Sequence, residues 1–257
     1  MPKRIISFSI FGEAAIYLEG ALRNVRLAAS VYPGWTPRVY CSNEIPSQLI
    51  ARMQEAGAEI VHKRRISAVD GTFWRFLPLA DPKLDAVIVR DVDSRINERE
   101  KAAVDEWLAS GRSLHIMRDH PFHKVPIMAG MWGGRGGCVP EMADLIERWS
   151  LWQNKGQDQD FLRDVIYPRF QDDCLVHSDL YEFDGETAVP FPTDRNLGEF
   201  VGSVMEADSD FMTSEEQLKH IPLFLKSSLR KLPRVRSRLK AWLLAEQWFR
   251  NIRRKAS

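Results

Sequence analysis

Two aspartates separated by one valine, Asp91 and Asp93, are the residues in this sequence best suited to hold a metal ion. Mg²⁺ and Mn²⁺ prefer oxygen ligands and commonly bind one or two carboxylates together with phosphate oxygens of a substrate. The bare D-x-D pattern is a weak signal, because aspartate pairs are common in exposed loops. Here it directly follows the apolar run 86–89, and this position at the end of an expected strand favours a metal-binding role.

The elements around the pair follow from hydrophobic periodicity. Strands are expected at 5–10, 38–41, 59–62, 86–89 and 114–117, and helices at 18–32, 47–56, 97–109, 140–149 and 157–166, with a loop at 121–137. Strands that alternate with helices at this spacing predict an α/β fold with a doubly wound, mostly parallel sheet. Ligands of such sheets bind beyond the carboxyl ends of the strands, which is where the aspartate pair is expected.

A rival interpretation of the same motif comes from phosphatases of the haloacid dehalogenase type, in which the first aspartate of a D-x-D is the nucleophile. In those enzymes the motif usually follows the first strand and continues into Thr or Val. Here it follows the fourth expected strand and continues with Ser94 and Arg95, so the phosphatase interpretation is less favoured.

The sequence resembles the GT-A class of glycosyltransferases, which act on nucleotide sugars, over roughly residues 5–205. The resemblance is carried by the order of segments 8–10 with the helix through Asn24, 74–78, 89–94, 130–133 and 158–162. The run Asp158-Gln159-Asp160 is also similar to that of glycogenin-type, retaining galactosyltransferases, which pair a D-x-D with a later metal-binding histidine.

The resemblance implies a nucleoside-diphosphate sugar held through Mn²⁺ or Mg²⁺ at Asp91 and Asp93. It implies a role for Arg75 beside the nucleotide or diphosphate, where a guanidinium can bind phosphate with two nitrogens. His177 stands where the late histidine is expected as a third metal ligand. The alternatives are an arginine bonded to a helix end or an acid, and a histidine at a strand end.

The resemblance further implies that Asp158 contacts sugar hydroxyls and that Gln159 faces the anomeric carbon, with Asp160 as the alternative sugar contact. Acids in the first turn of a helix are, however, stabilised by its dipole whatever their function. If configuration is inverted at the sugar, Asp158 or Asp160 is expected to be the general base.

The glycine-rich stretch 128–137 lacks the G-K-[ST] ending of a Walker A loop, so we do not interpret it as a phosphate-binding loop. Trp132 offers an apolar face to a sugar ring, and Gly133 lets the backbone approach the donor closely. Asp119 is a further candidate for binding the nucleotide sugar. The alternative is a loop without a binding role.

Length and composition indicate a globular protein with one domain and an appendage. The chain has 257 residues, of which 44% are apolar and 28% charged, which suits one catalytic domain, expected at 1–215, with an appendage at 216–257. No apolar run reaches the length of a membrane span, and 5–10 resembles a strand more than a signal peptide. Three widely spaced cysteines predict neither a disulfide framework nor a zinc site, and a cytoplasmic setting is expected.

The appendage is strongly basic. From residue 226 to the end there are eleven Lys or Arg and one acidic residue, against a net charge of +1 for the whole chain. An imperfectly amphipathic helix with Trp242 and Phe249 on its apolar side predicts peripheral binding to an anionic, cytoplasmic membrane surface. Packing on the acidic body is the main alternative, and nucleic-acid binding is less favoured.

The sequence therefore predicts a hexosyltransferase that moves a sugar from a nucleoside-diphosphate sugar to a hydroxyl of a glycan or glycolipid, in surface polysaccharide synthesis, with retention favoured over inversion. The competing hypothesis is a non-catalytic binding module that keeps the same fold. The intact Asp91/Asp93 pair argues against that module.

Overall fold

The computed structural model describes residues 3–67, 70–120, 123–149, 157–180, 182–183, 185–195 and 200–205. Its strands are β1 (Lys3–Ile10), β2 (Trp35–Ser42), β3 (Glu59–Lys63), β4 (Leu84–Arg90), β5 (Leu114–Arg118), β6 (Met131–Arg135), β7 (Cys174–Ser178) and β8 (Ala188–Val189). They form one sheet in the order β3-β2-β1-β4-β6-β5-β7-β8. The expected appendage at 216–257 lies outside the described residues.

All neighbouring strands of the sheet are parallel except for β6, which runs antiparallel to both β4 and β5. The carboxyl ends of β1, β4, β5 and β7 therefore share one edge of the sheet. The predicted α/β fold with a mostly parallel sheet is confirmed. The one reversed strand lies within 121–137, which we expected to be a loop.

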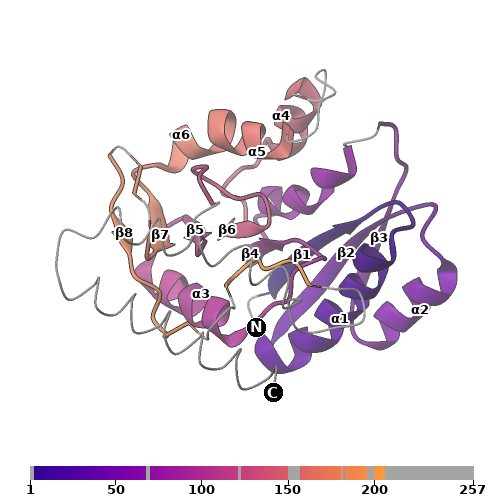
Figure 1. Ribbon diagram of the computed structural model, residues 1–257. Coiled ribbons are helices and arrows are strands. Elements are labelled where there is room, and N and C mark those ends of the chain that lie inside the picture. The colour runs from indigo at the N-terminus through magenta and orange to yellow at the C-terminus, as the bar shows by residue number, and fades with distance from the viewer. Residues whose placement is uncertain are drawn as a thin grey trace, which may run out of the picture.

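Helices cover both faces of the sheet (Figure 1). The α-helices are α1 (Ala15–Val31), α2 (Ser47–Glu55), α3 (Glu98–Ser110), α4 (Met142–Trp149), α5 (Gln157–Phe161) and α6 (Tyr167–Phe170), with 3₁₀ turns at Asp70–Thr72 and Trp74–Ala80. Figure 1 shows α1, α2 and α3 on one side and α4, α5 and α6 on the other. The helix expected at 157–166 is interrupted by a π-helical turn at Leu162–Ile166.

Two apolar cores follow from the alternation of side chains along the strands. In β4, Ala86 and Ile88 point into the core beneath α1, α2 and α3. Val87 and Val89 point into the opposite core, which is shared with α4, α5 and the 3₁₀ turn at 74–80. Because β4 is buried on both faces, the polar residues that follow it are fixed at the edge of a rigid sheet.

The β6 strand forms because two glycines allow close packing. A Cβ on Gly133 would lie 2.6 Å from the Val87 carbonyl oxygen, and one on Gly134 would lie 2.6 Å from Leu79. The large residues Met131 and Trp132 are buried. Glycine and tryptophan together obscure the two-residue period that identifies a strand, so the sequence indicated a loop here.

Helix α3 begins and ends as the sequence predicted. Asn97 is its N-cap and accepts a hydrogen bond from the Glu100 amide at 3.0 Å. Gly111 ends it in the left-handed conformation, with φ of 75°, which glycine adopts without a steric penalty. No helix among the described residues has both the length and the apolarity to cross a membrane.

A buried asparagine on α1 holds the turn that follows Asp91. Asn24 has no exposed surface; its Nδ2 donates to the carbonyls of Val92 at 3.3 Å and Ser94 at 2.7 Å, and its Oδ1 accepts from the Ile96 amide at 3.1 Å. One turn earlier, Gly20 allows α1 to approach this turn, because a Cβ there would overlap the Val92 carbonyl. Helix α1 therefore shapes the backbone that carries the aspartate pair.

We predict that Asn24→Ala lowers the free energy of unfolding by about 2–4 kcal/mol, because it leaves the buried Ile96 amide without its acceptor and leaves the Val92 and Ser94 carbonyls with Arg95 as their remaining donor. The measurement is denaturant unfolding. Ser30→Ala is the matched control, since Ser30 donates to the Leu27 carbonyl on the exposed side of the same helix, and a change within about 0.5 kcal/mol is expected. Equal losses in the two variants would contradict the prediction.

Candidate functional site

Asp91 and Asp93 follow the carboxyl end of β4, and buried polar groups hold this strand end. The side chains of Arg90 and Glu100 are each 2% exposed, and Arg90 Nε donates to Glu100 Oε1 at 3.0 Å. Arg90 Nη1 donates to the Trp132 carbonyl at 3.0 Å, and the Tyr32 hydroxyl donates to Glu100 at 2.9 Å. The backbone directly before Asp91 is therefore tied to α3, β6 and the end of α1.

An arginine joins Asp91 to a third carboxylate. Arg75, from the 3₁₀ turn at 74–80, donates through Nη1 to Asp91 Oδ1, and through Nη2 to Asp158 Oδ2 at 3.1 Å. The exposed fractions are 9% for Arg75, 13% for Asp158 and 41% for Asp91. Three of the residues predicted to act together are thus in contact, although they come from three separate segments of the chain.

Asp91, Asp93, Asp158 and Arg75 form a cluster, which we call the acidic cluster or simply the cluster. Its carboxylates hinder one another's ionisation. Burial and the neighbouring Asp91 raise the pKa of Asp93 from 3.8 to about 6. Burial also raises the pKa of Asp158, with Asp91 adding to the shift and Arg75 opposing it. Arg75 and Arg95 lower the pKa of Asp93, but two guanidiniums are set against three carboxylates, so the site has an excess of negative charge that a cation would offset.

Sequence reasoning missed two residues of this site. Gly130 lies against Asp91, and a Cβ at that position would overlap the Asp91 carboxylate. Tyr17, in the first turn of α1, is 41% exposed; burial raises its pKa, and so do the nearby charges of Asp93 and Asp91. The glycine-rich stretch 128–137 was a usable signal for Gly130, whereas nothing in the sequence distinguishes Tyr17.

The cluster fits one kind of metal site. Asp91 and Asp93 offer carboxylate oxygens, the ligands that Mg²⁺ and Mn²⁺ prefer. Across the part of the chain that the structure describes, no group of three or more His, Cys, Asp or Glu residues is arranged to hold a metal ion. Asp91 and Asp93 by themselves fit a cation whose other ligands are the phosphate oxygens of a substrate.

The prediction that His177 is a third metal ligand is not supported by its position. His177 lies on β7, which β6 and β5 separate from β4, and its side chain has no exposed surface. Its Nδ1 lies 2.9 Å from Nε2 of His115, and its Nε2 lies 3.3 Å from Glu106. Both ring nitrogens are thus engaged within the core, where burial lowers the pKa of His177.

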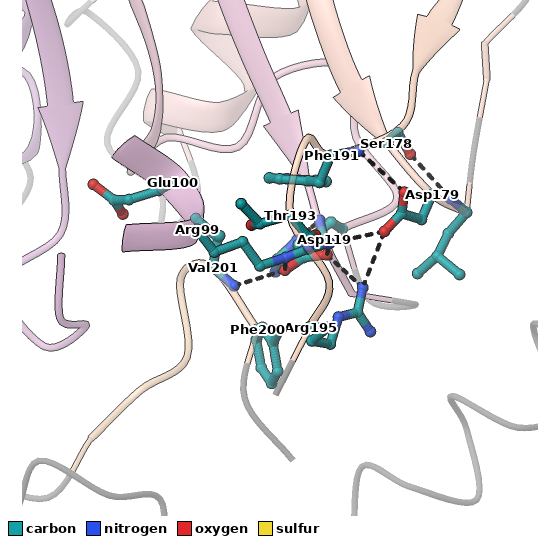
Figure 2. A network of polar contacts seen from close by, with 12 residues as sticks. Arg99, Glu100, Asp119, Ser178, Asp179, Phe191, Thr193, Arg195, Phe200 and Val201 are labelled. Atoms are coloured by element: carbon teal, nitrogen blue, oxygen red, sulfur yellow. Dashed lines mark hydrogen bonds and ion pairs between the residues drawn. The ribbon is translucent and has the colours of Figure 1, made fainter. Parts of the chain in front are cut away.

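Asp119 is a second correction, because its carboxylate is already fully bonded. The side chain has 0% exposure and accepts from Arg99 Nε and Nη2, both at 3.0 Å, from Arg195 Nη2, and from the Val201 amide at 3.0 Å (Figure 2). Burial opposes the charged form, yet Arg195 and Arg99 lower the pKa. Asp119 is therefore not available to a nucleotide sugar.

Trp132 and Gly133 are also structural. Trp132 has no exposed surface, and its ring packs edge-on against Phe76, with centroids 5.3 Å apart and an angle of 72°. It cannot present a face to a sugar ring. Gly133 serves the close packing of β6 on β4 described above, where Val87 would meet any side chain.

The three predicted sugar contacts at the start of α5 differ in their surroundings. Asp158 joins the cluster through Arg75 and also accepts a hydrogen bond from the Gln159 amide at 3.0 Å. Asp160 is 49% exposed and pairs with Arg163 at 2.7 Å. Only Asp158 is thus bonded into the cluster, and sugar-contact roles for Gln159 and Asp160 stay predictions.

Comparison with known proteins identifies no family. No family model matches the chain, and no curated protein matches it. A solved structure of the glycosyltransferase GlyE in Streptococcus pneumoniae TIGR4 matches with a TM-score of 0.47 and 16% identity, over 70% of this chain and 46% of that chain. A 4-diphosphocytidyl-2C-methyl-D-erythritol synthase from Anaerococcus prevotii DSM 20548 matches with a TM-score of 0.46 and 8% identity, over 85% and 94%.

The chain thus spans less than half the length of GlyE. The same share is covered in the structure of the apo form of GlyE, which matches with a TM-score of 0.45. Similarities of this size do not identify a function. Any assignment must rest on the residues gathered around Asp91.

The buried His123, which lies near Asp119, makes the free energy of unfolding depend on pH. His123 Nδ1 accepts from the Asp119 amide at 3.0 Å, and burial lowers the pKa of His123 from 6.5 to about 4, with Asp119 opposing the shift and Arg195 and Arg118 adding to it. The unfolded chain therefore takes up this proton first. The stabilising contribution is complete above the unfolded pKa and is lost as the pH falls towards the folded pKa.

We expect wild-type protein to lose about 2 kcal/mol of unfolding free energy through His123 between pH 7 and pH 5. In His123→Asn, the Asn oxygen can replace Nδ1 as acceptor, and this part of the acid dependence should disappear. Denaturant unfolding at several pH values measures it. The same substitution at exposed His62 should leave the acid dependence as it is; an unchanged slope in His123→Asn would contradict the prediction.

Proposed function

We propose that this chain is a metal-dependent glycosyltransferase that moves a sugar from a nucleoside-diphosphate sugar to an acceptor hydroxyl. One observation carries the proposal. Asp91, Asp93 and Asp158 gather around Arg75 at the edge of the sheet formed by the carboxyl ends of its parallel strands. Ligands bind at this edge in α/β sheets of this kind, and the charges of the cluster suit a diphosphate and a divalent cation.

Asp91 and Asp93 are the residues proposed to hold Mn²⁺ or Mg²⁺. When bound there, the ion would neutralise the diphosphate and stabilise the negative charge that develops on it as the sugar leaves. Burial, followed by the charge of Asp91, raises the pKa of Asp93. This supports the role, because a bound cation stabilises the ionised form of a buried carboxylate that has a like charge beside it. The exposure of Asp91, 41% for its side chain, leaves it open to a ligand.

Arg75 is proposed to bind the diphosphate. Its guanidinium already faces the cluster, and its forked nitrogens match phosphate oxygens as well as carboxylates. It is 9% exposed, so its side chain loses little freedom on binding. The same residue keeps Asp91 and Asp158 together in the unliganded protein, which preorganises the site.

Asp158 is proposed to contact the transferred sugar. It is largely buried, and its pKa is raised by burial and by Asp91, properties that suit a hydrogen-bond partner or a general base. With retention of configuration, Asp158 and Gln159 would line the reacting face. With inversion, Asp158 or Asp160 would take the proton from the acceptor hydroxyl.

The acceptor and the location are proposed from composition. A glycan or lipid-linked acceptor in surface polysaccharide synthesis would suit a protein whose basic segment from residue 226 onward binds the cytoplasmic face of an anionic membrane. That segment lies outside the described residues. Its role is independent of the chemistry at Asp91.

We predict that Mn²⁺ together with one nucleoside diphosphate raises the melting temperature, because a ligand that binds only the folded state stabilises it. A panel of UDP, GDP, ADP and CDP, each with and without Mn²⁺, identifies the base. Asp93→Asn should remove the Mn²⁺-dependent part of the shift. Asp105→Asn is the matched control, since Asp105 is exposed and pairs along α3 with Lys101, and it should behave as wild type.

A shift that is equally large in Asp93→Asn, or one that persists with a chelator, would contradict the metal mechanism. A metal-dependent shift without transfer or hydrolysis of any sugar nucleotide would instead favour the non-catalytic binding module. Release of phosphate from a simple phosphomonoester, lost in Asp91→Asn, would favour the phosphatase interpretation.

We predict that Asp158→Asn lowers kcat for sugar transfer by about 10²–10³-fold, the range observed when a group that acts in the transition state is removed. The Mn²⁺-dependent thermal shift should remain, because Asp158 is not a proposed metal ligand. Initial rates at saturating donor measure the effect. A kcat within about threefold of wild type would contradict the role given to Asp158.

A further inference from the structure

The chain after β8 returns across the sheet to the aspartate pair. β8 lies at one end of the strand order, four places from β4. Nevertheless, the Met205 amide donates to the Asp93 carbonyl at 2.8 Å, and Val204 forms an isolated β-bridge with Ser94. We call the described residues of this returning segment, 191–195 and 200–205, the strap.

The strap is held midway by the buried carboxylate of Asp119, which follows β5. Each carboxylate oxygen of Asp119 accepts one hydrogen bond from α3 and one from the strap. Oδ1 accepts from Arg99 and Arg195, and Oδ2 accepts from Arg99 and from the Val201 amide. Arg195 and Val201 belong to the strap, whereas Arg99 belongs to α3 (Figure 2). We call Asp119, Arg99 and Arg195 the clasp.

A second carboxylate extends the clasp towards β7. Asp179 Oδ2 accepts from Arg99 at 2.8 Å and lies 3.9 Å from Arg195. Asp179 Oδ1 accepts from the Phe191 amide at 3.2 Å, and the Phe191 ring covers the Arg99 guanidinium, 4.2 Å from its centroid. The charges of Arg99 and Arg195 therefore balance those of Asp119 and Asp179. Phe191, at the start of the strap, contacts this network through its backbone amide and its ring.

Such a network is a costly way to stabilise a fold. Burying charges carries a desolvation penalty that their attraction only partly offsets, and apolar residues of similar size often serve stability as well or better. What a fully bonded carboxylate adds is geometry, because each of its partners must lie at a fixed place. The clasp thus specifies where the strap crosses the end of β5.

Beyond the clasp, the strap packs against the surroundings of the site. Gly202, with φ of +84°, lies against Met131, the first residue of β6, and a side chain there would overlap it. Met131 follows Gly130, which itself contacts Asp91. The turn after Asp91 is therefore held by two elements, α1 through Asn24 and the strap through Met205.

We propose that the clasp positions the catalytic site by fixing strap residues 200–205 against the backbone of Asp93 and Ser94. Asp119 and Arg195 are then positioning residues, acting through the strap on Asp93 without touching the substrate. This inference rests on the proposed function for its catalytic consequence. The attachment of the strap is a property of the free protein and is tested separately.

Arg195→Gln is the informative variant, because Asp119→Asn would leave Arg99 and Arg195 with Asp179 as the one carboxylate of the network and would put folding itself at risk. Arg195 is 16% exposed, so glutamine is tolerated there. Hydrogen exchange followed by mass spectrometry reports on the amides of 200–205 without any ligand. We expect these amides to exchange at least tenfold faster than in wild type, while those of β1 and β4 are unchanged.

In the same variant, the affinity for Mn²⁺ with the nucleoside diphosphate that stabilises wild type should fall about tenfold, and Arg195→Lys should restore part of it by returning the charge. Arg169→Gln is the matched control, since Arg169 forms an exposed ion pair with Glu141 at 2.6 Å, and it should match wild type in both measurements.

Exchange of 200–205 within twofold of wild type in Arg195→Gln would overturn the clasp, even if nucleotide binding confirms the proposed function. Faster exchange of 200–205 with an unchanged affinity for Mn²⁺ and the nucleoside diphosphate would overturn the positioning role of the clasp. Faster exchange in a protein whose wild type binds none of the four nucleoside diphosphates would support the attachment of the strap while the proposed function fails.

Discussion

The rest of the site depends on one electrostatic constraint, the gathering of Asp91, Asp93 and Asp158 in a half-buried place. Like charges at short range are unfavourable, more so where water is partly excluded. Arg75 offsets part of this repulsion by bonding Asp91 and Asp158 together. Burial, and after it the charge of Asp91, still raise the pKa of Asp93 to about 6. The carboxylates therefore keep an unfavourable environment for their negative charge, and this is the basis of the proposed affinity for a cation.

Maintaining such a cluster requires a backbone that cannot relax. Three buried polar arrangements supply it, each from a different part of the fold. Asn24 bonds the turn 92–96 from α1, and Arg90 bonds Glu100 behind the strand end. The clasp around Asp119 holds the strap that reaches Asp93. Their hydrogen bonds are directional, so they fix the positions of backbone groups in a way that apolar contacts do not.

Local patterns predicted much of this protein. The first four strands, helices α1 and α2 and the capped ends of α3 were found from periodicity and turn residues, because those signals arise within a few neighbouring positions. One local prediction was wrong, the loop at 121–137 that contains β6. The functional predictions that the structure does not support concerned long-range contacts. Trp132 has an apolar face and Asp119 a charge, as any ligand-binding residue does. Whether a ring meets a sugar or Phe76, and whether a carboxylate meets a nucleotide or Arg99, depends on residues far away in the chain.

The sequence by itself determined that this is an α/β protein with an Asp91-Val92-Asp93 motif at the end of a buried strand, since hydrophobic alternation and strand order are local properties. Only the tertiary structure decided which acids share that site. It placed Asp158 against Arg75, excluded His177 by setting two strands between it and β4, and returned the strap to Asp93. The physical reason is that charges and hydrogen bonds act over a few ångströms, and the fold alone sets those distances between residues remote in sequence.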